Sequence, residues 1–122
     1  MRGLLILAAI MSIAWPANAN YAIMGIGAYT CGQFSKQYGD TGGTVEHDYF
    51  IWAQGFMSGN NSLMKGDAGQ TVDLTAETED DQRLFLRHYC SDHPLMEFYI
   101  AVEALYQQLG PAKPIPPARN SK

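Results

Sequence analysis

The stretch His88-Tyr-Cys90-Ser-Asp92-His93 gathers side chains that can bind zinc or carry out nucleophilic catalysis. Zinc takes three or four ligands, commonly from closely spaced pairs, but no second close pair of cysteines or histidines follows. The only other histidine, His47, lies far away in the sequence. A cysteine nucleophile needs a free thiolate within reach of a base. Any chemistry at this stretch therefore depends on the redox state of Cys90.

The N-terminal segment indicates the compartment, and with it the redox state. An apolar run from Leu4 to Trp15 has the length of a signal-peptide core and is too short to span a bilayer. Ala17-Asn18-Ala19 then supplies small residues at the positions that signal peptidase reads. We predict a signal peptide over residues 1–19, with cleavage between Ala19 and Asn20. The protein would be periplasmic or secreted, and no later segment is long and apolar enough to be a membrane helix.

The two cysteines of an exported protein are expected to pair in an oxidising compartment. A bridge from Cys31 to Cys90 would close a loop of about sixty residues, which the chain-entropy model values at roughly 4 kcal/mol. An intermolecular bridge and two free thiols are the alternatives. If the pair forms, Cys90 is no nucleophile. We then interpret residues 88–93 as a structural corner between two helices rather than a metal or catalytic site.

Other catalytic patterns are weak. Paired carboxylates can hydrolyse glycosides, but the acids Glu77, Glu79, Asp80 and Asp81 follow one another as a solvated helix start would. The sequence has no G-x-S-x-G elbow and no loop that would cradle phosphates. A small hydrolase or a metal protein is one alternative hypothesis for this chain. We nevertheless expect no enzyme activity, no metal and no cofactor.

The charge balance bears on the partners. The chain has 8 Lys and Arg against 12 Asp and Glu, which gives a formal net charge of −4. Removing residues 1–19 takes away one of these cations, so the remaining chain is more negative. Nucleic-acid affinity comes largely from cations that neutralise phosphates, so a nucleic-acid partner is disfavoured. An anionic membrane surface is disfavoured for the same reason. The charge would suit a basic protein partner.

Apolar residues at helical spacing predict four helices and no strand. The first helix follows Thr30, a suitable N-cap, and ends at Gly39. The second runs from about Val45 to Ser58, and the third begins at Thr78 or Asp80. About a hundred residues make one domain. We therefore expect an all-α bundle of about four helices, stapled by one disulfide and preceded by the signal peptide.

The fourth helix has the clearest pattern. Pro94 suits its first position, where the missing N–H costs nothing, and Gly110-Pro111 ends it. Its apolar residues recur at steps of three and four: Leu95, Phe98, Val102, Leu105 and Leu109. The domain would thus cover residues 20–110. The proline-rich tail, residues 111–122, should be extended or disordered.

The second helix holds the candidate contact residues. An interior glycine costs up to ~1 kcal/mol relative to alanine. We therefore expect Gly55 to allow close packing of another backbone and Gly59 to cap the helix. Phe50 falls off the main apolar stripe and is, with Asn60, the candidate for an exposed partner surface. The predicted core, bracketed by the two cysteines, contains Phe34, Tyr49, Trp52, Phe56, Leu86, Tyr89, Phe98, Val102 and Leu105.

Five groups of residues form a set that is specific only as a whole: Cys31 with Phe34, Trp52-Ala-Gln-Gly55-Phe-Met-Ser-Gly59-Asn60, Tyr89-Cys90, His93-Pro94, and Ala101-Val102 with Leu105. With this set, the chain resembles small exported bacterial proteins of the HdeA-like and type VI immunity (Rap/Tai-type) group. The resemblance covers most of the chain from Thr30 to Leu109. It implies a compact helical domain in which one disulfide joins an early helix to a late one.

The resemblance also implies two functions. Immunity relatives neutralise a specific protein partner, a cell-wall-degrading toxin, in the periplasm. HdeA-like relatives are acid-stress chaperones, and protonation of carboxylates below about pH 4 could expose the stripe from Tyr49 to Phe56 to clients. Few lysines speak against the second function. We expect a monomer or homodimer that works by binding protein.

Overall fold

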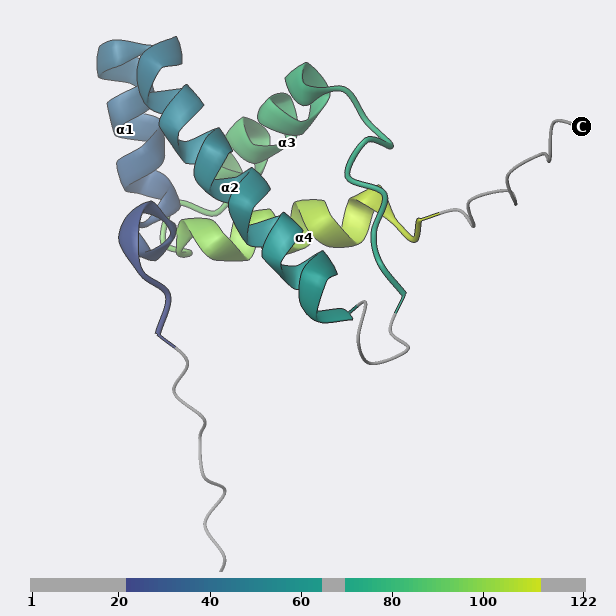
Figure 1. Cartoon of the computed structure of the whole chain (residues 1–122). Helices are drawn as coiled ribbons and strands as arrows, with labels where there is room; N and C mark the ends of the chain where they lie inside the picture. Colours follow the sequence, from purple (N-terminus) through teal and green to yellow (C-terminus); the bar gives the residue numbers. More distant parts are fainter. Residues whose placement is uncertain (1–21, 65–69, 113–122) are drawn as a thin grey trace, which may run out of the picture.

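The computed structural model describes residues 22–64 and 70–112, which form an all-α bundle (Figure 1). The predicted signal peptide, residues 1–19, and residues 113–122 of the predicted tail lie outside these ranges. The described ranges contain isolated bridges but no β-strand. The elements are η1 (Gly25–Ala28), α1 (Cys31–Thr41), α2 (Gly43–Met64), α3 (Glu79–Asp92) and α4 (Phe98–Leu109). The predicted all-α class with four helices is confirmed.

The helices pack around α4, which lies behind the long α2 in Figure 1. The backbone of α1 neighbours those of α2, α3 and α4, while α4 also packs against α3. The short η1 covers the junction of α2 and α4. Side chains join α2 to α3, because Arg87 of α3 forms an ion pair with Glu46 of α2.

Capping residues explain where α1 begins and where it gives way to α2. The Thr30 hydroxyl accepts from the backbone N–H of Gln33, whose side chain accepts from the Thr30 N–H in return, which forms a capping box. A left-handed Gly42, with φ of 65°, separates the two helices. Contrary to the prediction, α2 continues past Ser58 to Met64, so Gly59 caps nothing.

The third helix starts as predicted, but the fourth does not. The Thr78 hydroxyl accepts from the N–H of Asp81, and three acids occupy the first turn, where the helix dipole favours them. Helix α4 begins at Phe98, not at Pro94. The segment before it is held in another conformation by backbone hydrogen bonds to residues 29–32. Leu95 therefore stands outside the core, with 91% of its surface exposed.

Aromatic rings form the centre of the core. The Phe98 ring centroid lies 4.8 Å from that of Tyr49 and 5.3 Å from that of Phe34. Of the predicted core, Trp52, Phe56 and Tyr89 are partly buried, and the other six are buried. Five more buried apolar residues stand outside the predicted core set: Phe50, Ala53, Met57, Ala101 and Leu109.

The loop before α3 is fastened to the end of α4 and to α2. Val72 forms a bridge with Pro111, and the Ala112 N–H donates to the Thr71 carbonyl at 2.7 Å. From α2, the Asn61 amide bonds both the N–H and the carbonyl of Val72, each at 2.9 Å. The Tyr106 hydroxyl donates to the same amide at 2.6 Å. Residues 111–112 thus belong to the folded domain and not to a disordered tail.

Candidate functional site

A disulfide joins the first residue of α1 to the last turn of α3. The Cys31 and Cys90 sulfurs are 2.10 Å apart, and neither residue has exposed surface. The predicted pairing is confirmed. A thiolate nucleophile at Cys90 is thereby ruled out for the oxidised protein. The bridge ties α1 to α3 and leaves α2 attached by non-covalent contacts.

Beside the disulfide, two chain segments run antiparallel and fix the corner between α3 and α4. The Cys31 N–H donates to the Met96 carbonyl at 2.7 Å, and the Phe98 N–H donates to the Tyr29 carbonyl at 2.7 Å. The Gly32 N–H donates to the Pro94 carbonyl at 2.8 Å. Three short backbone hydrogen bonds, next to the Cys31–Cys90 bridge, therefore hold residues 94–98. The interpretation of this stretch as a structural corner agrees with that geometry.

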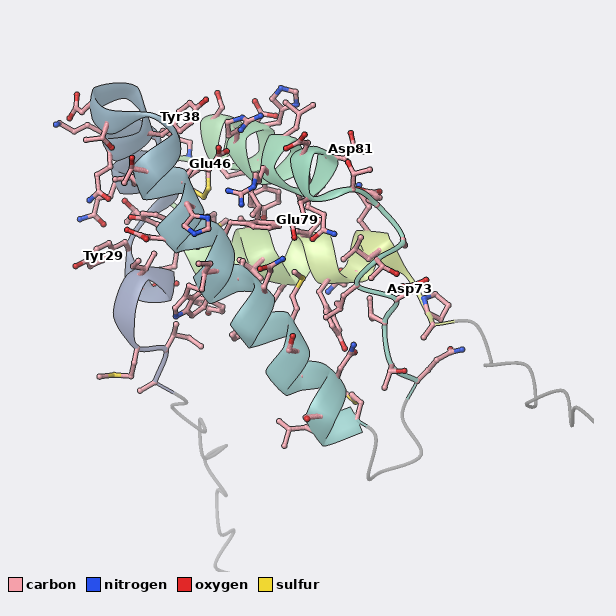
Figure 2. The ribbon with its side chains drawn as sticks, turned by 45° about the horizontal axis from the view of Figure 1, so that its top comes forward. Tyr29, Tyr38, Glu46, Asp73, Glu79 and Asp81 are labelled. Atoms are coloured by element: carbon pink, nitrogen blue, oxygen red, sulfur yellow. A yellow bond between two sulfur atoms is a disulfide. The ribbon has the colours of Figure 1, made fainter. Side chains whose placement is uncertain are left out.

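The corner presents apolar side chains to solvent. Leu95 is 91% exposed, Met96 49% and Tyr29 45%, and Figure 2 shows Tyr29 beside η1, pointing away from the helices. We call these three residues the corner patch. Single exposed apolar residues are common on protein surfaces, but a group of them on a fixed backbone is a typical protein-contact feature. No sequence pattern predicted this patch.

The histidines of the opening stretch do not converge. His88 and His93 are both exposed, and His93 caps the end of α3 with its ring 4.5 Å from that of Tyr89. His47 is exposed on α2. In the part of the chain that the structure describes, no group of three or more His, Cys, Asp or Glu residues could hold a metal ion.

The predicted helix-packing role of Gly55 and Gly59 is wrong for this chain. A Cβ added at either position would meet no atom within 4 Å, apart from the helix's own backbone. Both glycines lie on the exposed face of α2. Close approach occurs instead at Gly27 of η1, where an added Cβ would lie 2.1 Å from the indole ring of Trp52.

The predicted exposed role of Phe50 is also wrong. Phe50 is 1% exposed, and the guanidinium of Arg83 covers its ring, with Cζ 4.0 Å from the ring centroid. An arginine can pack its aliphatic stem and the face of its guanidinium on an aromatic ring while its N–H groups stay partly solvated. Phe50 therefore belongs to the core between α2 and α3. Asn60, the other candidate, is partly buried on α2.

The folded domain is strongly anionic. The described residues contain three cations, Lys36, Arg83 and Arg87, against eleven Asp and Glu. Each cation lies within ion-pair distance of an acid: Lys36 of Asp40 at 2.8 Å, Arg83 of Glu79 at 3.9 Å, and Arg87 of Glu46. The exposed surface is thus left with an excess of carboxylates, and a protein partner with basic groups would be attracted.

Two tyrosine hydroxyls are perturbed by their surroundings. Burial raises the pKa of Tyr49, whose hydroxyl donates to the Gln37 side chain at 3.1 Å, and nearby Tyr29 adds to the rise. Burial likewise raises the pKa of Tyr106. Asp40 raises the pKa of the exposed Lys36 ammonium through a hydrogen bond and its charge. All three shifts accompany structural contacts.

Comparisons with known proteins assign no relative to this fold. No family model matches the chain, and neither a curated protein nor a solved structure matches it. Within residues 22–64 and 70–112, no helix has both the length and the apolar character needed to cross a membrane. The function must therefore be argued from the surface itself.

Proposed function

We propose that this protein is an exported, periplasmic or secreted domain without catalytic activity, which neutralises a specific protein partner such as a cell-wall-degrading toxin. The observation that carries the proposal is Leu95, exposed over 91% of its surface on a backbone that the disulfide corner holds in place. The expected export agrees with the Cys31–Cys90 bridge, because such bridges persist in oxidising compartments.

The corner patch has the properties of an anchor in a protein interface. Burying a leucine side chain contributes about 1.5–3 kcal/mol, and few residues usually carry most of an interface's binding energy. Since the backbone around Leu95 is already fixed, little conformational entropy is lost when a partner covers it. Within the described chain, Leu95 is the most exposed of the large apolar residues.

Charge indicates which partner the patch fits. Asp92 and Glu97 flank the patch in sequence, and both are exposed. A partner that offers an apolar pocket with basic groups at its rim would satisfy both the leucine and the carboxylates. Complementary charge would also speed association at low salt.

A capture experiment with paired variants tests this proposal. The mature, oxidised protein is immobilised beside Leu95→Glu and Leu63→Glu and exposed to a periplasmic extract of the source organism at neutral pH. Leu63 is the control because it is 74% exposed on α2, away from the corner. One stoichiometric partner should bind the wild type and Leu63→Glu but not Leu95→Glu. Equal capture by all three proteins, or no partner for any, would refute the proposal.

An acid-stress chaperone is the second candidate, and one observation favours it. The disulfide joins α1 to α3, so α2, which carries Tyr49, Phe50 and Phe56, could separate from the bundle without breaking a covalent bond. Protonation of the many carboxylates below about pH 4 would weaken the electrostatic contacts that oppose this separation. Circular dichroism at pH 2 tests the idea: a fully native spectrum there would exclude an acid-triggered chaperone.

A further inference from the structure

A surface groove runs between α1 and α3, close to the disulfide but separate from the corner patch. Its volume is about 360 Å³, within the range of small-ligand sites. Three residues of each helix line it: Phe34, Ser35 and Tyr38 of α1, and Arg87, His88 and Ser91 of α3. The disulfide joins Cys31, about one turn before Phe34 in α1, to Cys90, which directly precedes Ser91 in α3, so the two walls are covalently tied together.

The chemistry of the lining differs from the rest of the domain. The described chain holds eleven acids and three cations, yet no acid lines the groove and Arg87 does. Ser35, Ser91 and Tyr38 add hydroxyl groups, and His88 adds an imidazole. The partly exposed ring of Tyr38 supplies apolar surface, with buried Phe34 beneath the floor. Hydrogen-bond donors thus meet an aromatic wall.

Arg87 is held in position before any ligand arrives. Its Nη1 donates to the Glu46 carboxylate of α2, and its Cζ lies 5.6 Å from the centroid of the Tyr38 ring. Figure 2 shows Tyr38 and Glu46 at the same end of the bundle. A guanidinium has five N–H donors in a planar fork, so the contact with Glu46 leaves donors for a second acceptor.

We propose that this groove binds an organic carboxylate with an apolar or aromatic stem. The carboxylate would accept from Arg87, with help from Ser91 and His88, while the stem would lie on the partly exposed ring of Tyr38. Glu46 partly neutralises the arginine, so the affinity for a small ligand should be modest. The proposal stands apart from the corner patch, because it concerns different residues and a different class of ligand.

Two probes that differ only in charge test it: N-acetyl-phenylalanine and its neutral carboxamide, titrated into the oxidised protein and followed by amide chemical shifts. The acid should shift the signals of Ser35, Tyr38, His88 and Ser91 with a dissociation constant of about 1 mM. The carboxamide should bind at least about tenfold more weakly, since it lacks the charge-assisted hydrogen bonds. Equal binding of the two probes would overturn the proposal.

The ion pair offers a matched pair of variants. Arg87→Gln and Glu46→Gln both remove the ion pair, but only Glu46→Gln keeps the cation and its contact with the Tyr38 ring. Arg87→Gln should lose the preference for the acid, whereas Glu46→Gln should bind the acid as well as the wild type or more tightly. If both variants weaken the acid equally, the pair merely shapes the groove and the proposal fails.

A second arm separates the two sources of such a carboxylate. Short peptides that end in phenylalanine are titrated with a free or an amidated C-terminus. Tighter binding of the free-acid peptide than of N-acetyl-phenylalanine would support the proposal and assign the carboxylate to a polypeptide end. If the free-acid peptide and N-acetyl-phenylalanine bind equally, the proposal is supported and the groove is assigned to a free small acid. Equal binding of the free and amidated peptides would count against any carboxylate.

Discussion

Replacing Gly55 or Gly59 by alanine should stabilise the protein. Both positions lie inside α2, where glycine costs about 0.8–1.0 kcal/mol relative to alanine. The added methyl group meets nothing within 4 Å at either position, so no clash offsets this gain. Each single variant should gain about 0.5–1 kcal/mol, and the double variant should gain about the sum, because the two positions share no packing partner.

Gly27→Ala is the matched opposite case. Its methyl group would lie 2.1 Å from the Trp52 ring, which is stacked on Phe56 with ring centroids 5.2 Å apart. Overpacking of this kind typically costs about 1–3 kcal/mol.

Urea unfolding, followed by circular dichroism, measures all three variants, and an unchanged slope ensures that midpoints report stability. Midpoints should rise for Gly55→Ala and Gly59→Ala and fall for Gly27→Ala. A loss of stability in Gly55→Ala would contradict the open α2 face. If that loss also depended on protein concentration, a second copy would be packing against these glycines.

Three further predictions concern the covalent, polar and titratable contacts. The double variant Cys31→Ser with Cys90→Ser should lose roughly 4 kcal/mol of unfolding free energy, and wild type measured in reductant should lose as much. A loss below about 1 kcal/mol would show that the disulfide is not the main source of stability. Asn61→Ala leaves both backbone groups of Val72 unpaired and should cost about 2–3 kcal/mol in urea unfolding, with faster hydrogen exchange in residues 71–73; unchanged exchange there would refute the anchoring role. Burial raises the pKa of Tyr49, so the folded state favours the neutral phenol; this stability is complete below about pH 10 and is lost as the pH rises through the folded pKa. Tyr49→Phe should therefore lose less stability than wild type between neutral and strongly alkaline pH, and equal losses would contradict the shift.

Local signals predicted the starts of α1 and α3 and the covalent frame. Thr30 and Thr78 act as N-caps because their hydroxyls accept from the backbone N–H three residues on, a preference that depends only on neighbouring residues. The Cys31–Cys90 pair followed from having two cysteines in a chain expected to be exported. The apolar period of α4 identified Phe98, Val102 and Leu105 as core residues.

Contacts between distant segments decided what the sequence pattern could not. Leu95 fits the helical period of α4, but bonds from Tyr29, Cys31 and Gly32 hold its segment outside that helix. Phe50 falls off the main stripe of α2, yet α3 supplies Arg83 to cover it. Glycine spacing predicted close packing at Gly55. The close packing that requires a glycine occurs instead in η1, where Trp52 lies against it. In each case the deciding partner is remote in sequence and carries no local signal.

The most direct test of partner binding through the corner is the affinity of the purified partner for three forms of the protein. Isothermal titration would compare wild type with Leu95→Ala and with the control Leu63→Ala. Losing a leucine anchor that contributes about 1.5–3 kcal/mol should weaken binding roughly tenfold to a hundredfold in Leu95→Ala. The control should stay within about twofold of wild type, as residues outside an interface do. An unchanged affinity in Leu95→Ala, or a large loss in Leu63→Ala alone, would contradict the account and place the interface on another face.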